Sequence, residues 1–303
     1  NQRESVLAWD PTTRKALTPL ILWSDKRTKE YCDQLKAAGH ESMIRQKTGL
    51  LLTPYSSASK LHWILNQPTV QASQHVALGT LDSWLVFNLT GQHLTDYTNA
   101  CRTMLYNIQS KQWDDQLLEL FAIPAQYLPR VIDSKADFGM WHIDDSTSLT
   151  IRAVVGDQQA SMYAAGTATG TTKVTYGTGI FPMRLLGDEF SLQEDYLTTL
   201  AIGPDTQPVY ALEGKVENAA PRVSVVYGID KPAFDKLMLK LAYEAAPVIA
   251  GLVDRPNHVV YVDGGISQNN DILAEQARLN HIHPQRLANH NGSALGVAKL
   301  LLS

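Results

Sequence analysis

The sequence predicts an α/β protein built as one large domain or two ordinary ones. Short apolar segments typical of strands alternate with amphipathic segments of helical period along most of the 303 residues. The pattern changes character at about Thr150, which is the predicted domain boundary. Hydrophobic residues make up 44% and charged residues 18% of the chain, a composition that argues against a disordered protein.

Before Thr150, strands and helices are predicted in alternation. The first strand covers residues 5–9, with a turn at Asp10-Pro11, and the apolar segment 20–23 is a predicted buried strand end. The helices predicted from apolar spacing cover residues 25–38, 60–66 and 79–89. Gly39 and Gly91 follow the first and the last of these helices and are expected to end them.

After Thr150, a strand over residues 151–155 is predicted to lead into a helix that ends near Gly166. Residues 172–185 are predicted to form a hairpin with Gly177-Thr178-Gly179 at its bend. The remaining predicted elements are strands over residues 196–202, 209–212 and 259–262, a long helix over 231–252 and a final helix over 293–302. Ser293 is the expected N-cap of that last helix.

Composition excludes several classes of protein. The formal net charge of −4 argues against a basic nucleic-acid-binding surface, and no uncharged apolar run of about 18 residues is present to span a membrane. Two cysteines, Cys32 and Cys101, are too few for a disulfide framework or a four-cysteine zinc site. This usage fits a reducing cytoplasm, which is the expected location.

Asp157 is the first candidate for chemistry. It lies where a predicted strand gives way to a helix, a position at which α/β folds place working groups. A carboxylate there could accept a proton from a hydroxyl nucleophile. It could equally be a helix N-cap, for which aspartate is preferred. Both interpretations remain open on spacing alone.

Two glycine motifs are candidates for phosphate contacts. In Tyr176-Gly177-Thr178-Gly179 the glycines allow backbone N–H groups to point outward around an anion, although an ordinary hairpin turn explains them as well. Asp263-Gly264-Gly265, followed by Asn269, allows a phosphate to approach closely at a helix N-terminus. Neither motif matches the P-loop or the dinucleotide-binding pattern.

A fourth group of residues suits a small polyhydroxylated ligand. Arg3 and Glu4 offer charge-assisted hydrogen bonds to hydroxyls, and Trp23 and Tyr55 offer rings to cover carbon edges. The alternative is an exposed ion pair and two core aromatics.

Taken in order, these motifs resemble the FGGY carbohydrate kinases. Residues 55–67 fit the first signature of that family at every specified position. Further blocks similar to the family lie at residues 1–4, 48–50, 96–105, 156–160, 176–179, 211–214, 262–265 and 294–296. The resemblance therefore covers nearly the whole chain.

The resemblance implies an actin-like, ribonuclease H-like pair of α/β domains with a cleft between them. Residues 1–149 would be the polyol-binding domain, and residues 150–303 the nucleotide-binding domain. Asp157 would be the general base. The positions that match acceptor ligands are Arg3, Glu4, Tyr55, Asp157 and Gln158, with Trp23 and Phe181 as an apolar wall; those that match nucleotide contacts are Gly177, Thr178, Gly179, Gly265 and Asn269.

The implied reaction is ATP-dependent phosphorylation of a polyol with Mg²⁺. Because the acceptor-contacting positions keep their residue types, glycerol is favoured, with glycerol 3-phosphate as the product. Two alternatives stay open: a kinase of the same family for another polyol or a ketose, and a non-catalytic polyol- or nucleotide-binding homologue. The implied partners are small molecules, and the resemblance also allows a homodimer.

Two departures from the family concern the nucleotide. The D-x-G-T-T-type phosphate hairpin expected before Asn1 is absent, so no metal ligand can be named. The chain is also short near Val216, where part of the adenosine site is expected, and the second family signature, expected near residues 227–244, is not matched. Either these segments belong to a longer protein or the natural chain lacks them and cannot transfer phosphate. The first is favoured, because decay of a dead kinase would not leave the acceptor residues intact.

Overall fold

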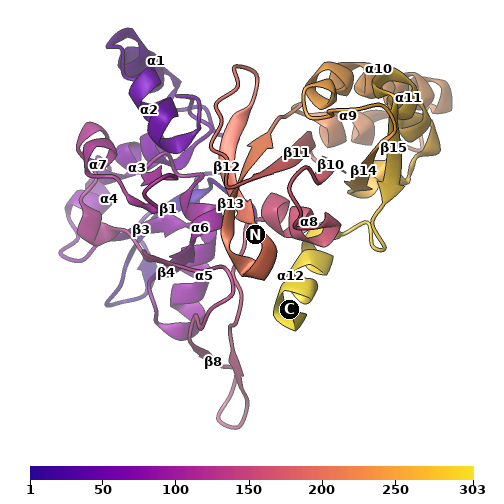
Figure 1. The fold of residues 1–303 in the computed structure, drawn as a ribbon. Helices are drawn as coiled ribbons and strands as arrows, with labels where there is room; N and C mark the ends of the chain where they lie inside the picture. Colours follow the sequence, from indigo (N-terminus) through magenta and orange to yellow (C-terminus); the bar gives the residue numbers. More distant parts are fainter. The chain divides into compact units, whose positions relative to one another are not determined.

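The computed structural model describes residues 1–303, which fold into two compact units, Asn1–Asp157 (unit 1) and Gln158–Ser303 (unit 2). Figure 1 shows unit 1 in indigo to magenta and the end of unit 2 in yellow. The division after residue 157 falls eight residues beyond the predicted boundary after residue 149.

Unit 1 contains a three-stranded antiparallel sheet in the order β2-β1-β3. Its strands are β1 (Val6–Asp10), β2 (Lys15–Ala16) and β3 (Ala77–Thr80). The first four residues of β1 are buried, Trp9 completely, which explains why this strand appears in the sequence as a continuous apolar run. The strand predicted over residues 5–9 is thus confirmed. The apolar segment 20–23 contributes only one bridge, from Ile21 to Val6.

Seven helices accompany this sheet. They are α1 (Lys29–Ala37), α2 (Glu41–Thr48), α3 (Ser57–Leu65), α4 (Pro68–Gln71), α5 (Leu81–Thr90), α6 (Tyr97–Ala100) and α7 (Asp115–Leu120), with a 3₁₀ turn at Ala125–Tyr127. The helix predicted over residues 25–38 begins only at Lys29. The helix predicted from residue 79 begins at Leu81, because Gly79 and Thr80 belong to β3.

Three strand pairs complete unit 1. They are β4 (Leu94–Asp96) with β7 (Arg130–Ile132), β5 (Tyr106–Asn107) with β6 (Gln112–Trp113), and β8 (Met140–His142) with β9 (Ser148–Thr150). The strand predicted over residues 151–155 is wrong. Only Ala153 forms an isolated bridge, to Lys135, because the backbone of this segment bonds to the irregular segment 134–139 rather than to a strand.

Unit 2 is built on a six-stranded sheet in the order β12-β13-β11-β10-β14-β15. Its strands are β10 (Thr172–Tyr176), β11 (Ile180–Gly187), β12 (Leu197–Ile202), β13 (Pro208–Glu213), β14 (His258–Asp263) and β15 (Ile282–Arg286). β10 to β13 pair antiparallel, whereas β14 and β15 continue parallel to β10. The predicted hairpin and the predicted strand pair are confirmed.

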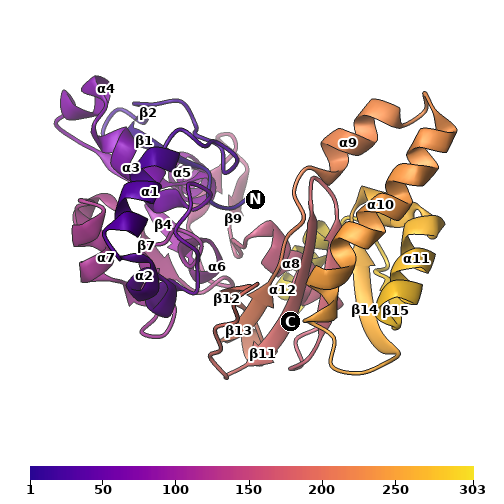
Figure 2. The ribbon, with the colours of Figure 1, turned by 90° about the horizontal axis from the view of Figure 1, so that it is seen from above.

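Helices cover both faces of this sheet. They are α8 (Asp157–Ala165), α9 (Ala219–Val226), α10 (Lys231–Ala250), α11 (Asn270–Asn280) and α12 (Gly292–Leu302), with 3₁₀ turns at Pro204–Thr206 and Gly265–Gln268. Ile180 of β11 packs with α10, whereas Met183 packs with Met162 of α8. Because successive side chains of a strand alternate between faces, α8 and α10 lie on opposite sides, as Figure 2 shows.

The N-cap of the last helix differs from the prediction. The side chain of Asn291, not that of Ser293, accepts the hydrogen bond from the Ala294 N–H at 3.2 Å. The helix therefore begins at Gly292, directly after its N-cap Asn291. Asparagine and serine are both favoured N-caps, so the sequence pattern allowed either residue.

Candidate active site

Arg3 and Glu4 lie in the turn before β1 and are 3% and 2% exposed. Glu4 has a φ of 62°, a conformation that non-glycine residues rarely adopt, and the Ser57 hydroxyl donates to its carbonyl oxygen at 3.2 Å. The Glu4 carboxylate accepts a hydrogen bond from Arg102 Nε at 2.6 Å. The predicted pair is therefore buried and hydrogen-bonded to neighbouring residues, and it is not an exposed ion pair.

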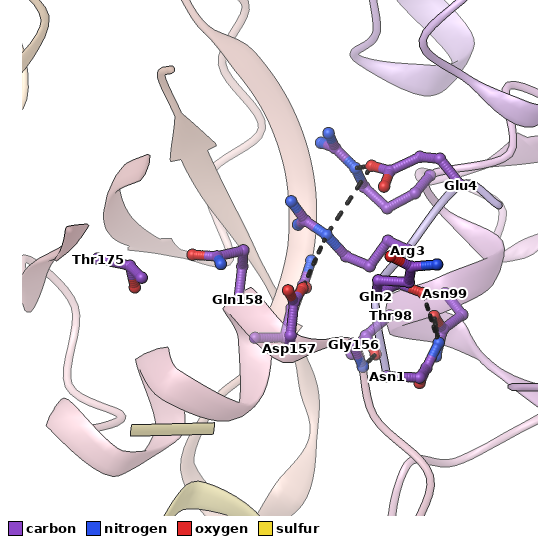
Figure 3. A network of polar contacts seen from close by, with 12 residues as sticks. Asn1, Gln2, Arg3, Glu4, Thr98, Asn99, Gly156, Asp157, Gln158 and Thr175 are labelled. Carbon is purple, nitrogen blue, oxygen red and sulfur yellow. Dashed lines mark hydrogen bonds and ion pairs between the residues drawn. The ribbon is translucent and has the colours of Figure 1, made fainter. Parts of the chain in front are cut away.

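Arg3 joins this pair to Asp157. Its Nε lies 3.8 Å from Glu4 Oε1 and 3.5 Å from Asp157 Oδ1, so it stands between the two carboxylates (Figure 3). With Arg102, the cluster contains two guanidinium groups and two carboxylates, which balances the charge that burial would otherwise penalise. Asp157, which is far from Arg3 and Glu4 in the sequence, thus lies beside them in unit 1.

Asp157 is the first residue of α8, and its backbone N–H donates to the Asn1 carbonyl at 2.9 Å. Its side chain is 37% exposed, whereas that of Arg3 is 2% exposed. The carboxylate is accordingly oriented from one side by an arginine and open to a ligand on another. This arrangement favours a carboxylate that contacts a ligand over one that only caps the helix.

Trp23 and Tyr55, the predicted aromatic wall of unit 1, pack against each other with ring centroids 5.3 Å apart. The loop that carries Tyr55 is held by Lys60, whose Nζ donates to the carbonyls of Pro54 at 2.8 Å and Tyr55 at 2.7 Å. Burial lowers the pKa of Lys60 to about 8. Lys60 and Arg102 were not predicted as site residues, although both lie in blocks that resemble the family.

Gln158 begins the polar interior of unit 2. Its Oε1 accepts from Lys173 Nζ at 2.5 Å, and the same ammonium donates to Thr175 Oγ1 at 2.7 Å. Thr175 Oγ1 in turn donates to Asp263 Oδ1 at 2.5 Å. Lys173 is 1% exposed and was missed from the sequence. A lysine at an inward position of a predicted buried strand is the signal that could have found it.

Phe181, the predicted wall residue of unit 2, is half-buried and lies opposite Thr175 in the β10–β11 ladder. Directly paired residues project from the same face of a sheet. Phe181 therefore shares its face with the chain of polar side chains that runs from Gln158 to Asp263.

A pocket of about 670 Å³ lies in unit 2. Four of the five predicted nucleotide contacts line it: Gly177, Thr178, Gly265 and Asn269. Its apolar wall is formed by Ala220 and Val223 of α9, Tyr227, Phe234 and Met238 of α10, and Ile266. Gly179 is not among the lining residues and packs instead against the Val216 carbonyl, from which an added Cβ would lie only 2.7 Å away.

Glycine is required where the loop after β14, which contains Gly264, contacts the end of β10 at Tyr176. Gly264 has a φ of 88°, and a Cβ there would lie 2.3 Å from the Tyr176 carbonyl oxygen. At Gly265 no atom lies within 4 Å of the position of a Cβ, so this backbone is open. Asn269 caps α11 by accepting from the Ile272 N–H at 3.0 Å. Open glycine backbone, the start of a helix and an apolar wall suit a nucleotide with its phosphates.

Comparison with known proteins places the chain in a family. Residues 1–164 match the model of the N-terminal domain of the FGGY family of carbohydrate kinases. The chain belongs to this family.

Curated relatives in the family are about 43% identical. A glycerol kinase of Xanthomonas campestris pv. campestris (strain 8004) is 43% identical over 226 residues, and one of Brucella ovis is 44% identical over 228 residues. Each alignment covers 71% of this chain and 45% of the relative. The chain thus spans about half the length of the curated relatives it matches.

Solved structures of FGGY kinases share the fold. The Plasmodium falciparum glycerol kinase solved with ADP superposes with a TM-score of 0.88 at 25% identity, over 99% of this chain and 73% of that one. A xylulose kinase from Rhodospirillum rubrum gives a TM-score of 0.83 at 17% identity, with the same coverage. The predicted actin-like, ribonuclease H-like α/β fold is confirmed.

No group of three or more histidine, cysteine, aspartate or glutamate side chains is arranged to hold a metal ion. No helix has both the length and the apolar character needed to cross a bilayer.

Proposed function

We propose that this protein phosphorylates a polyol at the expense of ATP, with glycerol as the favoured acceptor. The observation that carries the proposal is the partly exposed Asp157 carboxylate, held by Arg3 beside Glu4. Membership of the FGGY family and the glycerol kinases among the curated relatives support it.

Asp157 is assigned the role of general base. As the terminal hydroxyl oxygen of the acceptor attacks the γ-phosphorus, the hydroxyl proton passes to the carboxylate and the bond to the leaving ADP oxygen breaks. Arg3 orients the carboxylate from its buried side. Arg3 and Glu4 also offer a donor and an acceptor to the remaining hydroxyls, and the Trp23–Tyr55 pair covers the carbon edge of the polyol.

The residues around the pocket in unit 2 fit a nucleotide. The apolar wall from α9 and α10 suits the base, whereas the open backbone at Gly177 and Gly265 and the Thr178 hydroxyl suit the phosphates. Bound Mg²⁺ would neutralise charge on the phosphate oxygens, a role in which the ion is typically held by one or two carboxylates together with the phosphates. No residue of this chain is assigned as its ligand.

The second candidate is a kinase of the same family that acts on a ketose or a sugar acid. It is favoured by solved structures with the same fold whose names are xylulose kinase and gluconate kinase. Glycerol ranks first because the acceptor residues Arg3, Glu4, Tyr55 and Asp157 all keep the types that the sequence resemblance implies.

ADP release by the full chain with ATP, Mg²⁺ and a panel of glycerol, xylulose and gluconate tests the choice of acceptor. We expect the highest kcat/KM with glycerol. Strong activity on another acceptor beside weak activity on glycerol would reassign the substrate. Binding of glycerol and nucleotide, measured by calorimetry, without any turnover would replace the kinase by a binding protein.

Asp157→Asn tests the base. The amide keeps the size of the side chain but cannot take the proton, so we expect kcat to fall by about 10²- to 10⁴-fold. KM for glycerol should change only a few-fold. Asp145→Asn, on an exposed loop of the same unit, is the matched control and should keep wild-type kinetics. Near-normal turnover of Asp157→Asn would show that the base is another group.

A further inference from the structure

The segment Asp96–Arg102, which contains α6, touches every part of unit 1 that carries a proposed acceptor-binding charge. Thr98 bonds to Gly156, the neighbour of Asp157; Asn99 bonds to Asn1; and Arg102 bonds to Glu4. We name this segment the α6 platform. Figure 3 shows Thr98 and Asn99 of the platform beside the chain that leads to Asp157.

Asp96 organises the platform. It is completely buried, and its two carboxylate oxygens accept five hydrogen bonds: from the Thr98 N–H at 3.0 Å and hydroxyl at 2.6 Å, the Asn99 N–H at 3.1 Å and side-chain amide at 2.7 Å, and the Ser134 hydroxyl at 2.5 Å. A carboxylate with so many fixed donors has a single orientation. It therefore locks the side chains of Thr98 and Asn99.

The direction of each bond follows from the chemistry of the groups. A hydroxyl has one proton, and Thr98 gives it to Asp96, so toward Gly156 it can only accept; the Gly156 N–H donates to it at 2.9 Å. Thr98 thereby fixes the N–H of Gly156, the residue immediately before Asp157.

Asn99 completes a second route to the same residue. Its amide nitrogen donates to Asp96 at 2.7 Å and to Asn1 Oδ1 at 3.4 Å, and its oxygen accepts from the Asn1 side-chain amide at 3.0 Å. The Asn1 carbonyl then accepts from the Asp157 N–H at 2.9 Å. Two independent chains of hydrogen bonds thus run from the Asp96 carboxylate to the backbone at residues 156 and 157.

We infer that Asp96 and Thr98 are positioning residues for the base Asp157, acting through the backbone N–H groups of Gly156 and Asp157. The inference rests on the proposed function, because it gives these residues a role in that reaction. The base must lie within hydrogen-bond reach of the acceptor hydroxyl, and a misplacement of about 1 Å costs roughly 10²-fold in rate. Neither residue is proposed to touch the reacting atoms.

Thr98→Val is the decisive variant, because valine has nearly the shape of threonine but no hydroxyl. We expect kcat with glycerol to fall by about 10- to 100-fold, with KM for ATP unchanged. Thr98→Ser restores the hydroxyl and should restore most of kcat. Thr48→Val removes another fully buried threonine hydroxyl that both donates to and accepts from the backbone, and it should leave kcat unchanged.

A double-mutant cycle separates positioning from a general loss of structure. If Thr98 acts through Asp157, Thr98→Val should lower kcat no further once Asp157→Asn is present. An additional loss equal to that in the wild-type background, or equal losses in Thr98→Ser and Thr98→Val, would overturn the inference.

Amide hydrogen exchange at Gly156 and Asp157, followed by NMR, gives a readout that does not need turnover. Thr98→Val should raise exchange at Gly156, whose N–H loses its acceptor, by at least about tenfold, and Thr98→Ser should not. Unchanged exchange in Thr98→Val overturns the inference even if the protein is a glycerol kinase. Raised exchange in a protein without turnover would instead refute the proposed function and leave the hydrogen-bond platform in place.

Discussion

Three buried charged side chains near the proposed acceptor site of unit 1 have charged or polar partners. Arg3 and Glu4 are almost fully buried, and Lys60 is completely so, yet each has partners: a carboxylate, a guanidinium or backbone carbonyls. Burial of a charged side chain without a partner costs free energy, so buried charges are usually paired and hydrogen-bonded. The concentration of these buried charges around Asp157 and Tyr55 supports the proposed acceptor site.

Asp82 is a buried carboxyl without such compensation. Thr95 donates to its Oδ2 at 2.6 Å, but Oδ1 has no hydrogen-bond partner, and burial raises its pKa from 3.8 to about 6. The folded state then holds this proton more tightly than the unfolded chain does. The stabilisation from Asp82 is present below about pH 4 and is lost as the pH rises to about 6.

His93 acts in the opposite direction in the same pH range. It packs against Trp9 and Phe87, and burial lowers its pKa to about 4. The folded state disfavours the imidazolium, so stability from His93 falls as the pH drops from about 6.5 to about 4. A pH scan of the wild type alone therefore hides both effects.

Comparison of Asp82→Asn with the wild type isolates the carboxyl. We expect the free energy of unfolding of the wild type, relative to the variant, to fall as the pH rises from about 4 to about 6 and to stay level above it. Urea unfolding at several pH values measures this difference, and Asp145→Asn, an exposed carboxyl, is the control. A difference independent of pH would show that Asp82 keeps an ordinary pKa in the folded state.

At the scale of elements, one of the two four-residue helices of unit 1 connects directly to the proposed site. α6 has four residues, too few to be stable alone, and it exists because Asp96 caps it and β4 fixes its start. In unit 2, α9 and α10 give the pocket its apolar wall although the sequence there departs from the family.

The contact between α8 and α12 depends on one glycine. A Cβ at Gly296 of α12 would lie 1.7 Å from the Ala160 carbonyl oxygen of α8. We expect Gly296→Ala to lower the free energy of unfolding by about 3 kcal/mol, because backbone must move to admit the methyl group. Scanning calorimetry measures the loss, and Gly265→Ala, with open space around its Cβ, should keep the wild-type Tm. A small change for Gly296→Ala would mean that the two helices separate easily.

At the scale of the whole molecule, the charges proposed for the acceptor and the pocket proposed for the nucleotide belong to different units. Arg3, Glu4, Tyr55 and Asp157 lie in unit 1, whereas the pocket is lined only by residues of unit 2. The peptide bond between Asp157 and Gln158 joins the two units in the sequence. We therefore expect the acceptor to slow hydrogen exchange mainly in unit 1 and the nucleotide mainly in unit 2.

Hydrogen exchange measured by mass spectrometry tests this division in the full chain. We expect ADP alone to slow exchange over residues 176–179, 219–227 and 264–269, because these line the pocket. Glycerol alone should slow exchange over residues 1–5 and 53–57. Protection by ADP confined to residues 53–57, with none at 219–227, would place the nucleotide elsewhere.

Much of unit 2 could be predicted from local pattern. The hairpin around Gly177, the β12–β13 pair and the long helix α10 follow from alternation, turn glycines and helical spacing. The errors fell where partners distant in the sequence decide the structure. Residues 151–155 are apolar enough for a strand, but the segment they contact is irregular, so no ladder forms.

The sequence by itself determined the residue types that the proposed chemistry requires: the carboxylate at 157, the arginine and glutamate at 3 and 4, and the glycines of the pocket loops. It could not decide whether Asp157 is a helix cap or a functional carboxylate, or whether Gly177-Thr178-Gly179 is a plain hairpin turn or part of a pocket wall. In each case both alternatives have the same local sequence pattern. The tertiary structure decided how these residues lie, since burial and pairing depend on distant partners. Lys173, Arg102 and the α6 platform emerged only there, where long-range hydrogen bonds give them partners.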